Sequence, residues 1–318
     1  MSSLGPDKKI GPILPSPIQS LSGFGENKCR VRIKRDDLIH PLASGNKWRK
    51  LKYNLNQAEK QGAKTIVTMG GAFSNHIYAL AAIGNHYKFK TEGWIKGDYA
   101  DIDNPTLSYV REQNMNLTLF ESKEYKSIRW EGPHRKKLLQ KYEKPYFVPE
   151  GGSNIEGILG AAELMPEISS QLDPFPTHIC LSVGTGGTIC GVISASKGKT
   201  EILGFSAFKK DIHSVEIKAN LETLGKEDPG NWKIVNPLHF GGFGSFNADL
   251  VNFINDFYEQ YSIPLDPVYN GKLMFSLKKM ITEEYFPIGS DILVIHTGGL
   301  QGIDGFNQRF SNKYGMIG

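Results

Sequence analysis

Cysteine is scarce in this sequence. The chain of 318 residues holds three cysteines, Cys29, Cys180 and Cys190, and none of them belongs to a C-x-x-C pair. An odd and scattered set does not build a disulfide framework, and it lacks the ligand spacing of common zinc sites. We therefore expect reduced, mostly buried thiols and no bound metal.

Long apolar runs and charge of one sign are missing too. No segment approaches the roughly 20 apolar residues that cross a bilayer, and the stretch from Met1 to Lys9 has no apolar signal core. The net charge is only +4, and the densest basic cluster, Arg135 to Lys137, has no interleaved aromatic residues. These absences predict a cytoplasmic protein that binds neither membranes nor nucleic acid.

What is present indicates α/β architecture with two domains. The length, with 39% hydrophobic residues, is sufficient for two cores. From Lys64 onward, short β-branched runs alternate with helical patterns, which favours parallel sheets with helices on both faces. The predicted strands are Thr65 to Thr68, Leu117 to Phe120, His178 to Val183, Glu201 to Phe205 and Ile292 to Ile295, and helices are predicted to begin at His76, Pro105, Ile155, Thr188, Ile212, Leu250 and Gly271.

A glycine-rich stretch from Pro149 to Asn154 indicates a hinge or a ligand-facing loop. Together with a second boundary near Lys52, it predicts a larger domain of residues 1–52 and 158–318 and a smaller inserted α/β domain of residues 53–157. Ligands of open α/β sheets bind beyond the carboxyl ends of the strands. The polar loops after the strands are therefore the candidates for a site.

Two of these loops offer an amine and an anion-binding helix start. In Ser44 to Leu51, a Gly-Asn turn presents Lys47, whose amine can attack a carbonyl once desolvation removes its proton. In Met69 to His76, small residues and then Ser74 and Asn75 precede a helix, whose free N–H groups suit a carboxylate. A solvated lysine and simple N-capping are the alternatives.

Two further regions suit a phosphate and proton transfer. Gly184, Thr185, Gly186, Gly187 and Thr188 follow an apolar strand and precede a helix, which describes a phosphate cup or, alternatively, a tight structural turn. Near the C-terminus, Tyr269 precedes a helix and His296 follows a strand. Either side chain could exchange protons, although a packed tyrosine and a hydrogen-bonded structural histidine are the simpler interpretations.

Taken in order, the segments G-N-K-x-R-K-L, G-G-x-x-S-N-H, G-T-G-G-T, L-D-P-V-Y-x-G-K and H-T-G-G resemble the 1-aminocyclopropane-1-carboxylate deaminase and D-cysteine desulfhydrase family. The likeness spans about Ile33 to Gly302. It implies a fold-type II enzyme, similar to the β subunit of tryptophan synthase, with pyridoxal 5'-phosphate in the cleft between two domains. It also implies a homodimer that acts on a small amino acid.

The resemblance assigns roles to individual residues. Lys47 would hold the cofactor as a Schiff base, Asn75 would bind the 3'-hydroxyl of its ring, and Gly184 to Thr188 would bind its phosphate. Ser74, with backbone groups of Asn75 and His76, would receive the substrate carboxylate. Tyr269 would face the substrate as a proton donor or acceptor.

The chain departs from the deaminase pattern at three positions. Asn270 stands where those enzymes carry Glu, Thr297 where they carry Leu, and Phe243 where a second active-site tyrosine is expected. A hydroxyl such as Thr297 beside the pyridine nitrogen leaves the ring a weaker electron sink than a carboxylate does, which favours prompt loss of a β leaving group. We therefore expect β-elimination from D-cysteine or a related amino acid, giving a 2-oxo acid, ammonia and a thiol.

Three other functions are compatible with parts of this pattern. Deamination of 1-aminocyclopropane-1-carboxylate is the main alternative, and Asn270 argues against it. A cofactor-binding protein with little turnover receives some support from Phe243. A nicotinamide-dependent dehydrogenase is disfavoured, because the third glycine of its fingerprint would fall on Ile189.

Overall fold

The computed structural model describes residues 11–97, 103–196, 198, 200–208, 213–235, 238 and 240–318. The helix start predicted at Ile212 lies outside these residues, and helix α9 is observed over Ser214–Thr223. Within the described residues, no helix combines the length and the apolar character that a membrane crossing requires.

A six-stranded sheet forms the larger lobe. Its strands follow the order β1 (Ile18–Ser20), β2 (Arg30–Lys34), β10 (Asp291–Ile295), β7 (His178–Val183), β8 (Glu201–Ser206) and β9 (Trp232–Val235). All neighbours are parallel except β1, which pairs antiparallel with β2. The parallel arrangement places the carboxyl ends of β10, β7 and β8 at one edge of the sheet.

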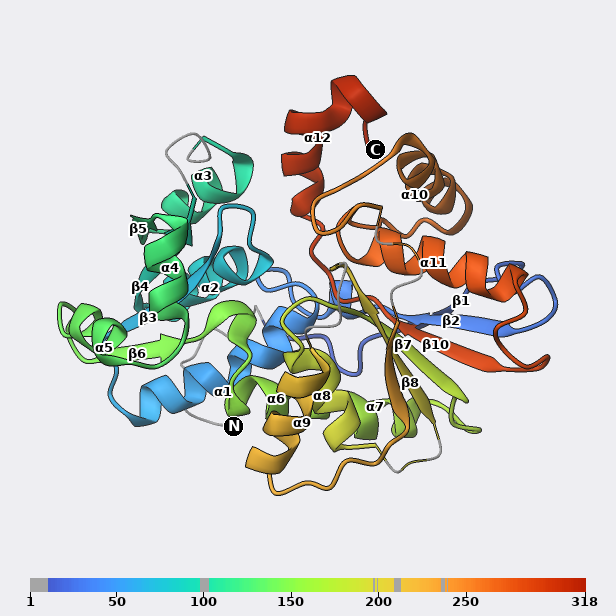
Figure 1. Cartoon of the computed structure of the whole chain (residues 1–318), viewed down its shortest axis with the longest axis horizontal. Helices are drawn as coiled ribbons and strands as arrows, with labels where there is room; N and C mark the ends of the chain where they lie inside the picture. Colours follow the sequence, from blue (N-terminus) through green and yellow to red (C-terminus); the bar gives the residue numbers. More distant parts are fainter. Residues whose placement is uncertain are drawn as a thin grey trace.

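Helices cover both faces of this sheet because its strands are apolar on both sides. Ile292 and Val294 of β10 pack with α10 (Ala248–Tyr261) and α11 (Asn270–Thr282). Leu293 and Ile295 alternate with them and pack on the opposite face. That face is covered by α6 (Ile155–Ala162), α7 (Leu164–Gln171), α8 (Gly187–Ser194) and α9, which lie below the sheet in Figure 1.

A four-stranded parallel sheet forms the smaller lobe. Its order is β5 (Met115–Phe120), β4 (Lys90–Lys96), β3 (Thr65–Gly71) and β6 (Pro145–Val148). One face packs against α2 (Asn75–His86) and α3 (Pro105–Glu112), and the other packs against α4 (Ser122–Arg129). Helix α5 (Pro133–Leu139) carries the basic cluster Arg135 to Lys137.

Helix α1 (Asn46–Lys60) joins the two lobes. Its residues Leu51 and Leu55 belong to the core of the smaller lobe, while the backbone of Arg49 packs directly against Gly160 of α6. Helix α12 (Gly302–Tyr314) extends from the larger lobe toward α3 (Figure 1). All strands of the smaller lobe fall between β2 and β7 in sequence, and the predicted limits at residues 53 and 157 stay a prediction.

All five predicted strands are present. Two of the strands that were not predicted, β2 and β4, contain buried charged residues. β2 reads RVRIK, and its Lys34 is buried against Glu167 at 2.6 Å. β4 reads KTEGWIK, and its buried Glu92 accepts a hydrogen bond from Thr118 at 2.6 Å. Because partners on other elements satisfy these side chains, the strands are buried despite their polar sequences.

Candidate active site

The five loops singled out in the sequence meet beyond the carboxyl ends of β3, β7 and β10. Gly45 has a left-handed backbone (φ 69°) and no room for a β-carbon, because the carbonyl group of Thr297 lies against it. The N–H of Asn46 donates to that carbonyl at 3.2 Å. These contacts fix the start of α1 at the end of β10 and place Lys47 beside Thr297.

The amine of Lys47 is half-buried and turned toward the glycine loop. It donates to Asn46 Oδ1 at 2.7 Å, and Asn46 Nδ2 donates to Thr188 Oγ1 at 2.8 Å. Burial lowers the pKa of Lys47 from 10.5 to about 8, and Asp266 partly opposes that shift. Two hydrogen bonds thus connect the predicted nucleophile to the predicted phosphate cup, and the amine loses its proton more readily than an exposed lysine.

The glycine loop forms an open helix start at α8. Gly186 adopts a left-handed conformation (φ 79°) as the N-cap of α8 and supplies no side chain to the free N–H groups of the first turn. The hydroxyl of Thr185 lies 2.6 Å from Ser153 Oγ. Backbone N–H groups, hydroxyls and the positive end of the helix dipole therefore face one small space.

Lys50 also reaches this space, and no role was predicted for it from the sequence. Its amine donates to Ser153 Oγ at 2.9 Å, and a β-carbon on Gly187 would lie 2.8 Å from the same amine. Burial, and then the charge of Lys47, lower the pKa of Lys50 well below 10.5. Lys50 follows Lys47 by three positions, so their place on one helical face was the signal that could have revealed it.

His76 is buried on the inner side of the same site. The Thr68 hydroxyl has one proton and donates it to the Val148 carbonyl at 2.7 Å, so His76 Nε2, at 2.9 Å, must donate to Thr68. His76 Nδ1 is then an unprotonated acceptor, and it has no hydrogen-bond partner among the described residues. Burial lowers the pKa of His76 well below 6.5, with repulsion from Lys47 and Lys50 acting in the same direction, and keeps the ring neutral.

The loop before α2 presents free N–H groups, as the sequence suggested. Ser74 is the N-cap and accepts from the Ile77 N–H at 3.3 Å, so the capping interpretation holds as well. Among the described residues, neither the N–H of Asn75 nor that of His76 donates to a protein acceptor. The first turn of α2 therefore retains donors for an anion such as a carboxylate.

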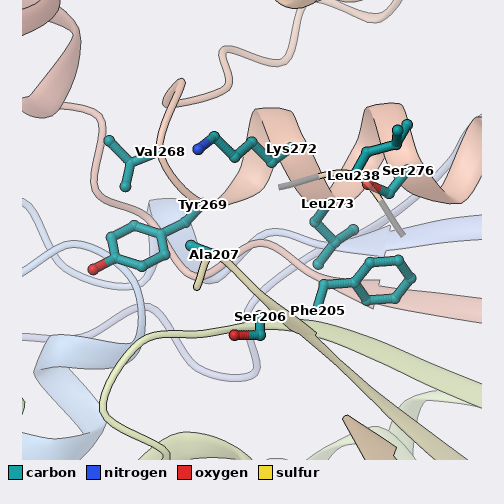
Figure 2. A pocket seen from close by; sticks show the side chains of 9 residues that line it. All are labelled: Phe205, Ser206, Ala207, Leu238, Val268, Tyr269, Lys272, Leu273 and Ser276. Atoms are coloured by element: carbon teal, nitrogen blue, oxygen red, sulfur yellow. The ribbon is translucent and has the colours of Figure 1, made fainter. Parts of the chain in front are cut away.

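Tyr269 faces the glycine loop from the start of α11. A β-carbon on Gly184 would lie 3.2 Å from the Tyr269 hydroxyl, and the ring of Phe243 meets Tyr269 edge-on at 5.9 Å. Burial and the charge of Asp266 raise the pKa of Tyr269 above its usual range, so the phenol keeps its proton. Figure 2 shows this phenol directed away from the Lys272 amine, although both residues line one small pocket.

Thr297 and Asn270 are held in one buried network. Asn270 Oδ1 accepts from the Thr297 N–H at 3.1 Å and from its hydroxyl at 3.3 Å, while Asn270 Nδ2 donates to Asp266 and to the Gly298 carbonyl. The Thr297 hydroxyl lies 2.8 Å from Ser182 Oγ at the end of β7. Asn270 thus uses its hydrogen-bonding groups inside the protein and supports Thr297. His296 is structural, because its Nε2 contacts the Pro264 carbonyl at 2.8 Å and its Nδ1 accepts from Gly298 N–H.

Comparison with known proteins identifies the class. A family model described as pyridoxal-phosphate dependent enzyme matches residues 10–298, and the chain belongs to that family. A putative 1-aminocyclopropane-1-carboxylate deaminase of Thermotoga maritima is 31% identical, over 91% of this chain and 95% of the relative. A bifunctional D-cysteine desulfhydrase/1-aminocyclopropane-1-carboxylate deaminase of Arabidopsis thaliana is 30% identical, over 91% and 77%.

Structural comparison agrees with the sequence. A solved structure of an ACC deaminase homologue superimposes with a TM-score of 0.81 and 26% identity, and covers 92% of each chain. The predicted family, the α/β fold of fold type II and the dependence on pyridoxal phosphate are therefore confirmed.

The residues at the site fit this cofactor. Among the described residues, no carboxylate forms an ion pair with the buried Lys50 amine, which lies at the lip of the glycine loop. A buried cation without a counterion is costly, and a phosphate would neutralise it. Lys47 provides an amine at the other end of the same space. The side chain of Asn46 separates this amine from the Thr188 hydroxyl and forms a hydrogen bond with each of them.

Proposed function

We propose that this chain is a lyase that catalyses β-elimination from D-cysteine or a related small β-substituted amino acid, and so yields a 2-oxo acid, ammonia and a thiol. One observation carries this function. The Lys47 amine is connected by hydrogen bonds through Asn46 to the glycine loop, and the Lys50 amine lies beside the same loop. The names of the curated relatives support the choice of substrate.

The cofactor would occupy the space between these two lysines. Lys47 would attach it covalently, while Lys50, Ser153 and the loop Gly184 to Thr188 would hold its phosphate. Asn75 would donate to the ring oxygen, and the Thr297 hydroxyl would lie at the ring nitrogen. When bound, the cofactor supplies a conjugated ring that withdraws electrons from the substrate α-carbon.

The side chains of this chain would then orient the substrate and move its protons. The free N–H groups of α2 and the Ser74 hydroxyl would hold the carboxylate. Lys47, whose pKa of about 8 allows it to act as a base near neutral pH, would accept the α-proton as the bond from the β-carbon to sulfur breaks. The sulfur would leave with the bonding electrons, and Tyr269, which keeps its proton and faces the glycine loop, would donate a proton to it.

Thr297 and Asn270 favour elimination over opening of a cyclopropane ring. A neutral hydroxyl at the ring nitrogen makes a weaker electron sink than a carboxylate. Asn270, whose amide is engaged with Asp266, Gly298 and Thr297, supplies no negative charge in its place. A substrate with a good β leaving group depends less on a strong sink.

Quaternary structure and location belong to the same proposal. We propose a cytoplasmic homodimer with the larger domain formed by residues 1–52 and 158–318 and the smaller by residues 53–157. The family likeness supports the dimer, and the two separate sheets support the domain division. Sedimentation analysis that finds a monomer would overturn the dimer without touching the chemistry.

The test is the visible spectrum of the purified protein before and after borohydride reduction. We expect an absorbing cofactor whose reduced adduct is located on Lys47 by mass spectrometry. Lys47→Ala should lose the adduct and at least about a thousandfold in turnover, because it removes both attachment and base. Lys60→Ala, at the exposed end of α1, is the control and should retain both.

Product analysis separates the substrates. Sulfide and pyruvate from D-cysteine are expected, and 2-oxobutanoate from 1-aminocyclopropane-1-carboxylate is expected to be much slower. An adduct on another lysine would refute the site, whereas faster release of 2-oxobutanoate would refute only the assigned reaction.

A further inference from the structure

The start of α12 contacts the predicted carboxylate loop from the opposite lobe. The side-chain amide of Gln301, the N-cap of α12, donates to Asn75 Oδ1 at the first residue of α2. These residues are 226 positions apart in sequence. Helix α12 is anchored in the larger lobe, because buried Phe306 lies in its core and meets Phe246 edge-on at 5.0 Å. The contact therefore joins the two lobes at the predicted site.

The Gln301 contact fixes which end of the Asn75 amide remains available. Because Gln301 occupies Oδ1, the Nδ2 group lies on the side of Gly299. It lies so close that a β-carbon on Gly299 would collide with it. Among the described residues, Asn75 Nδ2 donates to no protein acceptor. A donor that is oriented but unused, beside Gly299 in the loop after β10, is suited to an acceptor supplied by a ligand.

Two more contacts hold the same loop against α12. Gly305 leaves no space for a side chain beside Phe73, since a β-carbon there would lie 2.8 Å from the Phe73 ring. The Arg309 guanidinium lies over the same ring, 5.0 Å from its centre. Phe73 comes directly before Ser74, so α12 contacts the loop on both sides of its N-cap.

We propose that Gln301 is a positioning residue for Asn75. It holds the Asn75 carbonyl so that Nδ2 is the atom presented to the cofactor's ring oxygen, and it does so from the larger lobe, with Phe73, Gly305 and Arg309 setting the distance. The donor is then in place only when the two lobes are together. This inference rests on the proposed cofactor site and adds to it a residue outside the glycine loop and the lysine helix.

The test is a pH titration of the visible absorption of the cofactor-loaded protein. A donor to the ring oxygen stabilises the deprotonated chromophore, in which that oxygen carries more negative charge. Loss of that donor should raise the midpoint of the titration. We expect Asn75→Ala to raise it by about one pH unit, the effect of one hydrogen bond to a charged group.

Gln301→Glu is the informative variant. A carboxylate at this position can only accept, so the Asn75 amide must turn and donate Nδ2 to it. The midpoint should rise almost as far as in Asn75→Ala. Gln301→Met removes the contact without reversing it and should give a smaller rise. Gln308→Met, an exposed glutamine on the same helix, should leave the midpoint unchanged.

Unchanged midpoints in both Gln301 variants, with a shift in Asn75→Ala, would overturn the role of Gln301. An unchanged midpoint in Asn75→Ala would overturn the inference as well, because Asn75 would then not reach the ring. If Gln301→Glu does not fold, Gln301→Met decides the matter alone. Failure of the proposed function has a different signature, which is the absence of a borohydride adduct on Lys47 in the unaltered protein.

Discussion

Arg49 and Lys50 are adjacent buried residues of α1, but they belong to two groups of side chains that differ in how the buried cation is balanced. In the paired cluster, Arg49 contacts Asp36 at 2.7 Å and Glu167 at 2.9 Å, and Lys34 contacts Glu167 at 2.6 Å. Each buried cation there has a carboxylate within hydrogen-bonding distance. The paired cluster joins β2, α1 and α7 and needs nothing from outside.

The amine cluster consists of Lys47, Lys50 and His76. Among the described residues, the hydrogen-bond partners of its two lysines are neutral, namely Asn46 Oδ1 and Ser153 Oγ. Burial lowers the pKa of Lys47, and the charge of Asp266 opposes that shift only in part; in the part of the chain that the structure describes, no carboxylate opposes the lowering of the pKa of Lys50. A buried ion pair therefore belongs to the fold, whereas a buried amine without a carboxylate marks a place for an anionic ligand.

Among the substitutions that test the two clusters, Arg49→Met should have the largest effect on the unfolding free energy. This substitution leaves the buried Asp36 and the partly buried Glu167 with one cation fewer, which should cost about 3–5 kcal/mol of unfolding free energy. Chemical denaturation of the cofactor-free protein measures it, with Lys60→Met as an exposed control on the same helix. If Arg49→Met were as stable as the control, the paired cluster would not support the fold.

The two clusters should affect the pH dependence of the unfolding free energy at opposite ends of the pH range, the paired cluster in acid and the amine cluster in alkali. Burial opposes the shift, but Arg49 and Lys34 lower the pKa of Glu167 from 4.5 to about 2, so its contribution is present above pH 4.5 and is lost between pH 4.5 and 2. The folded pKa of Lys47 is depressed from 10.5 to about 8, so its burial costs stability below pH 8 and that cost disappears between pH 8 and 10.5. Each limb should span at most about 3 kcal/mol.

Denaturation of the cofactor-free protein across this pH range tests both limbs. Glu167→Gln should flatten the acid limb, and Lys47→Met should flatten the alkaline one. If stability still rises between pH 8 and 10.5 in Lys47→Met, burial of the Lys47 amine does not cause that rise.

Lys50→Met should have the opposite effect to Arg49→Met, because it should weaken cofactor binding without lowering stability. In the cofactor-free protein it removes a buried cation that has no carboxylate, so the unfolding free energy should stay unchanged or rise. Affinity for pyridoxal phosphate should fall roughly 10- to 100-fold, the loss of one charge-assisted hydrogen bond. Equilibrium titration of the cofactor-free protein measures the affinity. A destabilised protein with unaltered affinity would place Lys50 with the fold instead.

The sequence allowed prediction of the loops of this site, but not of all their partners. Lys47, Ser74 and Gly184 to Thr188 were recognisable because their motifs occur together and in the order of the resembled family, although each motif alone has a simpler structural interpretation. Ser153 and Gln301 were not assigned, because their partners Lys50 and Asn75 lie 103 and 226 positions away in sequence. Such roles exist only once the two lobes are assembled.

The fold shows the same limit. β7 and β10 were predicted because they are apolar on both faces, as central parallel strands must be. β2 was missed because Arg32 and Lys34 interrupt its apolar pattern, and their partners Asp291 and Glu167 come from distant segments. Polar residues that are neutralised by tertiary contacts are not recognisable as buried in the sequence alone.

The smallest expected effect is that of Ser153→Ala. The Ser153 hydroxyl contacts both Lys50 and Thr185, so its loss should weaken cofactor binding about fivefold, the contribution of one neutral hydrogen bond. In the Lys50→Met background the same change should cost less, because part of its effect acts through the amine. Ser16→Ala is the matched control, since Ser16 donates to Asp36 at 2.6 Å in the paired cluster and should lower stability but not affinity. Equal losses of affinity from the two serines would remove the distinction between the clusters.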